Sequence, residues 1–134
     1  TVVIPNAPEA EVLTGMTIVN VDDAKIAARM LVDEIGASCA VVKGGHLEGP
    51  ATDVLYDGSE FTLFSQERIP TKNTHGTGCT FASATAAGLA KGLSTQDAVS
   101  EAKAYVTAAI QSSIEIGGGH GPLNHFYELW NKSD

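Results

Sequence analysis

The sequence contains few cysteines, few basic residues and no long apolar run. Its two cysteines, Cys39 and Cys79, lie far apart in different contexts, which argues against a disulfide-stapled fold and favours a reduced, cytoplasmic protein. Eight basic residues against sixteen acidic ones give a formal net charge of −8. Because the basic residues are scattered, we expect neither nucleic acid nor an anionic membrane as the main partner. No stretch approaches the roughly 20 consecutive apolar residues that a spanning helix needs.

The length and composition are those of an ordinary globular chain. The 134 residues, 43% of them hydrophobic and 18% charged, predict a single domain, residues 1–134, around one core. The chain opens on Thr1 rather than methionine, and TVVIP has the character of the end of a strand. We therefore expect an N-terminal portion to be missing.

The strand pattern predicts a sheet with a hairpin at one edge. Residues 1–4 are β-branched or apolar and end at Pro5, and residues 37–46, ASCAVVKGGH, contain a fully buried strand. The segment 53–69 alternates on either side of Asp57-Gly58-Ser59, as a β-hairpin does. With helices between the strands, this pattern favours an α/β fold: a mainly parallel sheet flanked by helices, with an antiparallel edge.

Four helices and a last short turn accompany these strands. The first begins at Pro8 and ends before Gly15, and the second is capped by Asp22 or Asp23 and ends at Gly36. A small-residue helix follows from about Cys79 to Leu89. Ser94-Thr95 then caps a long helix that the glycines at 117–119 end.

The segment NTHGTGCTFASA, residues 73–84, leads from a glycine turn into a helix. The first N–H groups of a helix lack intrahelical partners and the helix dipole is positive there, so the turn is a candidate anion site. The same field favours the thiolate of Cys79, which makes this residue a candidate base or nucleophile. The pattern alone leaves open a second interpretation, a tight loop followed by a small buried cysteine.

Four segments in a fixed order carry a resemblance to a known family. They are IPNAPEAEVLTG (4–15), VVKGGH (41–46), NTHGTGCTFASA (73–84) and GGHGPLNHF (118–126). This order resembles the C-terminal half of ribokinase-like small-molecule kinases, and more narrowly the hydroxymethylpyrimidine/phosphomethylpyrimidine kinases of thiamin biosynthesis. Most ribokinase-like enzymes carry aspartate where this sequence has Cys79, and the cysteine form is typical of the pyrimidine kinases and some related pyridoxal kinases.

The resemblance implies a role for each motif. The backbone N–H groups of Gly76, Thr77, Gly78 and Cys79 form an anion hole for the transferred phosphoryl group. Cys79 takes the proton from the hydroxymethyl group of the substrate while its oxygen attacks the γ-phosphorus of ATP.

The other motifs are implied to bind the nucleotide and its metal ion. Asn6 and Glu9 form an N-x-x-E motif that holds Mg²⁺ through water, although their spacing alone favours a helix-terminus role for Glu9. Lys43 precedes the pair Gly44-Gly45, and the resemblance implies that Lys43 and Gly45 bind the ATP phosphates. For His46, His75, His120 and His125 we expect no catalytic role, and no zinc-ligand spacing is present.

The resemblance also implies what this chain lacks. Kinases of this type are about twice as long, and their N-terminal half supplies most of the central sheet and of the pyrimidine pocket. We expect the isolated chain to be inactive or very weak, and to cover its sheet edge by self-association as a homodimer. Two alternatives stay open: a pyridoxal or pyridoxine kinase on the same scaffold, and a non-catalytic nucleotide-binding fragment. A cysteine hydrolase using His75 lacks a third orienting group and a nucleophile elbow.

Overall fold

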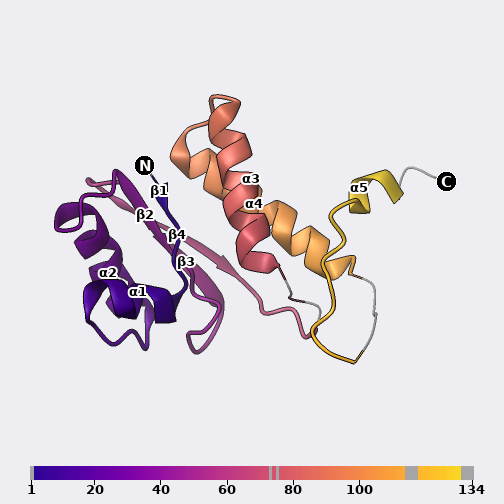
Figure 1. Cartoon of the computed structure of the whole chain (residues 1–134), viewed down its shortest axis with the longest axis horizontal. Coiled ribbons are helices and arrows are strands. Elements are labelled where there is room, and N and C mark those ends of the chain that lie inside the picture. The colour runs from indigo at the N-terminus through magenta and orange to yellow at the C-terminus, as the bar shows by residue number, and fades with distance from the viewer. Residues whose placement is uncertain (1, 73, 75, 114–117, 131–134) are drawn as a thin grey trace. The chain divides into compact units, whose positions relative to one another are not determined.

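The computed structural model describes residues 2–72, 74, 76–113 and 118–130. The chain divides into two compact units, Thr1–Arg68 and Ile69–Asp134. Figure 1 shows the helices and strands of both units.

The first unit is built on a sheet of four strands in the order β1-β2-β3-β4. These are β1 (Val2–Val3), β2 (Cys39–Val42), β3 (Ala51–Tyr56) and β4 (Phe61–Gln66). β1 and β2 are parallel, with Val2 opposite Cys39, and the other two pairs are antiparallel. The predicted hairpin is therefore confirmed as the antiparallel edge. The sheet of this chain is mixed rather than mainly parallel as predicted, because only the β1–β2 pair among the described strands is parallel.

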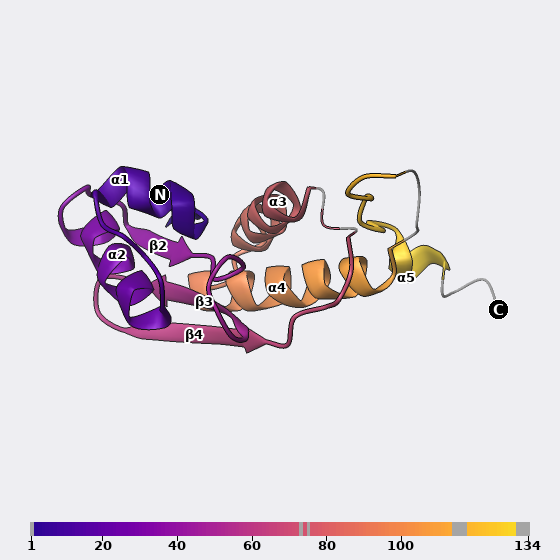
Figure 2. The same ribbon diagram turned by 90° about the horizontal axis from the view of Figure 1, so that it is seen from below.

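Two helices cover one face of this sheet, as Figure 2 shows: α1 (Ala7–Thr14) and α2 (Val21–Asp33). α2 turns Ala24, Ala27, Ala28 and Leu31 inward, and all four are buried. They form one hydrophobic core with Ala40, Val42, Val54 and Tyr56 of the strands. The apolar spacing of the helix and the buried strands thus build the core that the sequence predicts.

The caps of these helices differ in part from the predicted ones. α1 begins at Ala7, one residue before the expected Pro8, because Asn6 caps it. The expectation that Asp22 or Asp23 caps α2 is wrong: the cap is Asn20, which has an extended backbone and whose Oδ1 accepts the Asp23 N–H at 2.9 Å. Both aspartates lie in the first turn of the helix instead, where their charge complements the dipole.

The second unit packs α3 (Thr77–Ala90) against α4 (Thr95–Gln111), and α5 (Tyr127–Trp130) follows. The two long helices approach closely at Gly88, where a Cβ would lie 3.0 Å from that of Ala98. The predicted cap Ser94 is confirmed, since its Oγ accepts the Asp97 N–H. α4 ends at Gln111 with Ser112 as its C-cap, earlier than predicted, and residues 114–116 of the predicted helix lie outside the described residues.

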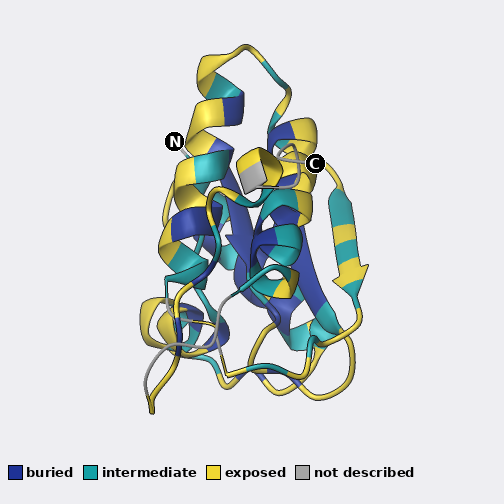
Figure 3. Ribbon diagram, turned by 90° about the vertical axis from the view of Figure 1, so that its right-hand side faces the viewer, coloured by how far each residue is buried: buried dark blue, intermediate teal, exposed yellow. Residues whose placement is uncertain are grey.

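Burial follows the amphipathic pattern in both units, with buried positions on the strands and on the inner helix faces (Figure 3). None of the helices within the described residues has the length and apolar character needed to cross a membrane.

Candidate functional site

The glycine turn begins α3 two residues earlier than predicted. Gly76 is the N-cap in a left-handed conformation, with φ 81°, and the Thr80 N–H donates to its carbonyl at 2.9 Å. A side chain is strained at such a positive φ, which explains why glycine stands there. Cys79 is therefore the third residue of the helix, still within the first turn, where backbone N–H groups have no intrahelical acceptor.

Two amides of this turn have no partner among the described residues. No side chain in that part of the chain caps α3. The Thr77 N–H donates to the Thr74 carbonyl at 3.2 Å, whereas no acceptor within the described residues takes the N–H of Gly78 or Cys79. Amides without an acceptor in the described part of the chain, at the positive end of a 14-residue helix, are suited to an anion.

The two cysteines differ sharply in environment. Cys79 is exposed and free, and Cys39 is free and buried in β2. Burial, reinforced by the negative charge of Asp57, raises the pKa of the Cys39 thiol and so disfavours its thiolate. The alternative of a small buried cysteine at position 79 is therefore wrong, and Cys79 is the thiol that solvent and ligands can reach.

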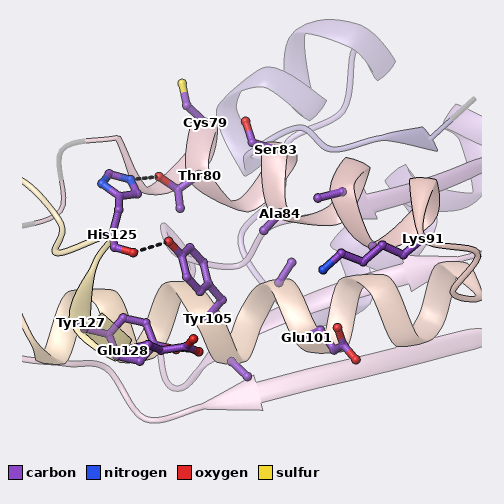
Figure 4. A pocket seen from close by; sticks show the side chains of 14 residues that line it. Cys79, Thr80, Ser83, Ala84, Lys91, Glu101, Tyr105, His125, Tyr127 and Glu128 are labelled. Atoms are coloured by element: carbon purple, nitrogen blue, oxygen red, sulfur yellow. Dashed lines mark hydrogen bonds between the residues drawn. The ribbon is translucent and has the colours of Figure 1, made fainter. Parts of the chain in front are cut away.

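A cavity of about 850 Å³ lies between α3 and α4 beside this turn (Figure 4). Small residues form its floor: Ala84, Ala87, Gly88, Ala102 and Ala104. Lys91 and Glu101 line one end, and Tyr105, His125 and Glu128 line the other. Cys79 stands at the rim, with its sulfur pointing away from α4 in Figure 4.

The N-x-x-E motif forms a capping box at the start of α1. Asn6 Oδ1 accepts the Glu9 N–H at 2.8 Å, and Glu9 Oε2 accepts the Asn6 N–H at 2.8 Å. The helix-terminus role that the spacing favours is thus present. It engages one carboxylate oxygen of Glu9, an exposed residue, and leaves Oε1 outside the box.

The fold brings Lys43 next to this motif. Lys43 forms a parallel bridge with Asn6, and its N–H donates to the Pro5 carbonyl at 2.9 Å. Parallel chains end at the same edge of a sheet, so the 36 residues between Asn6 and Lys43 return the chain to one edge. Asn6, Glu9 and Lys43 therefore lie in one group, as the resemblance implies for residues that share a triphosphate.

Of the two glycines after Lys43, Gly44 is the sterically required one. Its N–H donates to Asp53 Oδ1 at 2.9 Å, and a Cβ there would lie 1.9 Å from the Thr52 carbonyl oxygen. Gly45, the residue that the sequence analysis selected, is exposed and has open space around its Cα. The structure therefore adds Gly44 and Asp53 to the residues that shape this loop.

Arg68 is a second residue that the sequence analysis missed. Its guanidinium donates to the carbonyl of Gly45 at 2.6 Å, to that of Gly49 at 2.8 Å and to that of Leu47. One planar group thus fixes three points of the loop that follows Lys43. The sequence offered no signal for this role, because Arg68 is 19 or more positions away from these carbonyls.

The oxygen donors near Lys43 fit a Mg²⁺ ion that keeps most of its water ligands. Within the described residues, no three His, Cys, Asp or Glu side chains gather as a metal cluster. Glu9 offers one carboxylate oxygen beyond the capping box, and Mg²⁺ commonly uses one or two carboxylates while water and phosphate complete its octahedron.

The histidines occupy different places. His46 is exposed in the loop after β2, and His75 lies outside the described residues. His120 Nδ1 lies 3.2 Å from the Lys72 carbonyl oxygen, and His125 Nε2 lies 2.9 Å from Thr80 Oγ1. The last two therefore connect the C-terminal segment to the chain around the glycine turn.

The predicted site residues thus form two groups. Asn6, Glu9, Lys43 and Gly45 belong to the first unit, and the turn Gly76–Cys79 belongs to the second.

Comparison with known proteins gives a consistent result. The family profile described as phosphomethylpyrimidine kinase matches residues 1–124. Hydroxymethylpyrimidine/phosphomethylpyrimidine kinase of Bacillus subtilis is 50% identical over 126 residues, which cover 92% of this chain and 46% of the relative. The thiamine biosynthesis bifunctional protein ThiED of Geobacter sulfurreducens is 51% identical over 124 residues, which cover 92% of this chain and 25% of the relative.

Solved structures agree with these sequence matches. The pyridoxal kinase of Staphylococcus aureus in complex with AMP-PCP and pyridoxal has a TM-score of 0.90 at 37% identity, over 100% of this chain and 50% of that one. The α/β, ribokinase-like fold that the sequence predicts is thereby confirmed. The chain spans about half the length of the Bacillus subtilis kinase and of the Staphylococcus aureus kinase. By sequence and by fold, this chain belongs to the phosphomethylpyrimidine kinase family.

Proposed function

We propose that this chain is the phosphate-binding, C-terminal half of an ATP-dependent kinase that phosphorylates hydroxymethylpyrimidine and its monophosphate in thiamin biosynthesis. The observation that carries the proposal is the exposed Cys79 in an uncapped first helical turn, within a chain that matches this family over residues 1–124. The names of two relatives at 50% and 51% identity support the substrate and the pathway.

In this proposal the amides of the glycine turn bind the phosphoryl group in transfer. The N–H groups of Gly78 and Cys79, which no described residue accepts, donate to its oxygens, and the dipole of α3 favours their negative charge. Phosphoryl transfer depends mainly on such positioning and charge stabilisation. The turn supplies both without a cationic side chain.

Cys79 is the proposed general base. Its sulfur accepts the proton of the hydroxymethyl group as that oxygen bonds to the γ-phosphorus, and the bond from the γ-phosphorus to the bridging oxygen of ADP breaks. Cys79 is exposed, so its sulfur can contact a substrate hydroxyl. Cys39 is buried and cannot make this contact.

Lys43, with Asn6 and Glu9 beside it, is the proposed binding group for the nucleotide phosphates. The lysine supplies positive charge next to Gly45, and the Glu9 oxygen outside the capping box would help to hold Mg²⁺ through water. Magnesium, when bound, neutralises phosphate charge. The complex of a related kinase with AMP-PCP supports ATP as the phosphoryl donor.

A chimaera tests the proposal. In the chimaera, this chain replaces the segment of the Bacillus subtilis kinase that it matches at 50% identity. The assay measures ADP release with hydroxymethylpyrimidine as the substrate. We expect turnover in the chimaera, and a loss of about 100-fold or more in kcat for Cys79→Ala, within the range that a general base contributes. Cys39→Ala is the matched control and keeps turnover. A chimaera that folds and binds ATP but does not phosphorylate the pyrimidine contradicts the proposal.

Pyridoxal kinase activity is the second candidate, because a pyridoxal kinase is 37% identical over the whole chain. Parallel assays with pyridoxal and hydroxymethylpyrimidine on the longer protein that carries this sequence separate the two. A higher kcat/KM for pyridoxal would favour this alternative.

A non-catalytic nucleotide-binding fragment is the third candidate. In the isolated 134-residue chain, we expect ATP with Mg²⁺ to slow the alkylation of Cys79, and we expect no measurable phosphoryl transfer. Robust turnover by the isolated chain would contradict the expected inactivity. Protection without turnover in the chimaera would favour the binding module.

A further inference from the structure

The C-terminal segment 118–126, called the strap below, contacts α4 and the residue of α3 that follows the glycine turn. His125 Nε2 lies 2.9 Å from Thr80 Oγ1, and Tyr105 of α4 donates its hydroxyl to the His125 carbonyl at 2.8 Å (Figure 4). The Asn124 N–H donates to the Ala109 carbonyl at 3.1 Å. The side chain of Leu123 is buried. The strap is therefore fastened to α4 at two points and reaches α3 through one side chain.

Thr80 connects this contact to the glycine turn. Its N–H donates to the Gly76 carbonyl at 2.9 Å, which closes the first turn of α3 around Cys79. Helical threonines often bond their hydroxyl to the carbonyl four residues earlier, whereas the buried Thr80 directs its hydroxyl to His125. The backbone of Thr80 thus holds the turn, and its side chain is held by the strap.

We propose that His125 is a positioning residue for phosphoryl transfer: through Thr80 it fixes the direction of the Gly78 and Cys79 amides. The proposal rests on the proposed function, since it assumes that these amides bind phosphate. Groups that stabilise a transition state act well only when held within about 0.5 Å of their productive positions. Thr77 holds the start of this turn through its N–H and its hydroxyl, which both donate to the Thr74 carbonyl, and Thr80 holds its other end.

Two pairs of variants isolate the hydrogen bond. Thr80→Val and His125→Leu keep approximate size and remove it, whereas Thr80→Ser and His125→Gln keep a polar partner. Thr85→Val is the matched control: it makes the same exchange in the same helix, at a hydroxyl that donates to the Phe81 carbonyl. The double variant Thr80→Val/His125→Leu completes a mutant cycle.

The first measurement needs no ligand. Amide hydrogen exchange in the 134-residue chain reports the bond between the Thr80 N–H and the Gly76 carbonyl. We expect roughly two- to tenfold faster exchange at Thr80, relative to amides in the middle of α4, in Thr80→Val and His125→Leu. The conservative variants and Thr85→Val keep the wild-type ratio, and the double variant is no faster than either single one. Equal ratios in all variants would overturn the proposal.

The second measurement reports ATP binding as protection of Cys79 from iodoacetamide. We expect Thr80→Val and His125→Leu to weaken apparent ATP affinity roughly two- to tenfold, with rescue in Thr80→Ser and His125→Gln and no change in Thr85→Val. If ATP does not protect wild-type Cys79, the proposed function fails, and hydrogen exchange still decides whether the strap holds the turn. If ATP protects wild type and every variant equally, the positioning role is wrong.

Discussion

Gly44 and Gly45 are adjacent in the sequence but have opposite steric requirements. A Cβ at Gly44 would lie 1.9 Å from the backbone oxygen of Thr52, and a Cβ at Gly45 would meet nothing within 4 Å. Because the obstructing atom belongs to the backbone of β3, the strand itself would have to move.

We therefore expect Gly44→Ala to lower the free energy of unfolding by about 1–3 kcal/mol, the range for overpacking a well-packed site. Gly45→Ala is the matched control and changes it by less than about 0.5 kcal/mol. Urea unfolding followed by circular dichroism gives both values. A similar free energy of unfolding for the two variants would show that β3 yields easily at this point.

Glu9 allows the capping and metal roles to be separated. A glutamine keeps an oxygen that can accept the Asn6 N–H but removes the negative charge. We expect Glu9→Gln to unfold within about 0.5 kcal/mol of wild type, and to raise the Mg²⁺ concentration needed for ATP to protect Cys79.

Glu9→Ala is the contrasting variant. It removes both roles, and we expect it to lose stability by about 1 kcal/mol as well, as loss of a cap does. If Glu9→Gln needs no more Mg²⁺ than wild type, Glu9 is a helix cap and no more.

At the scale of elements, the β3–β4 turn depends on one ionised carboxylate. Asp57 Oδ1 accepts the N–H groups of Ser59 at 2.8 Å and Glu60 at 2.9 Å, and the Ser59 hydroxyl at 2.8 Å. These hydrogen bonds, that of Glu60 first, lower the pKa of Asp57. Since the folded form binds its proton less readily, this contribution is fully present above the ordinary pKa of about 3.9 and is lost as pH falls below it.

We expect acidification from about pH 5 to about pH 3 to destabilise wild type more than Asp57→Asn, because asparagine keeps an acceptor and does not titrate in this range. Urea midpoints at a series of pH values measure the difference, and the two proteins are compared at pH 7 as the reference. Parallel acid dependence of the two midpoints would rule out Asp57 as the source.

At the scale of the whole molecule, the sheet has two edge strands within the described residues, β1 and β4. β4 pairs with β3 alone and exposes Leu63. An open, partly apolar edge is a template for another chain.

We therefore expect the chain to form a homodimer, measured by sedimentation equilibrium. A charge on the edge strand opposes such pairing, so Leu63→Lys shifts the equilibrium toward monomer, whereas Val12→Lys, at an exposed apolar residue of α1, does not. A wild-type chain that is monomeric at all concentrations would contradict the expected dimer.

Local patterns predicted most of the elements and the fold class. The alternation around Asp57-Gly58 and the apolar spacing of α2 each come from a single segment that packs with one face. A short stretch of sequence is therefore enough to recognise each element. The cap of α2 was misassigned because Asn20, Asp22 and Asp23 are all suitable caps. Backbone conformation, which composition does not report, selects among them.

The sequence by itself determined the family of this protein and the positions of its glycine turn and cysteine, because both are carried by short motifs whose order along the chain is visible. Only the tertiary structure decided that Gly44 must be glycine, that Arg68 fixes the loop after Lys43, and that His125 holds Thr80. These contacts join residues 8, 19 or more, and 45 positions apart. The physical reason is that such contacts depend on where the chain returns in space.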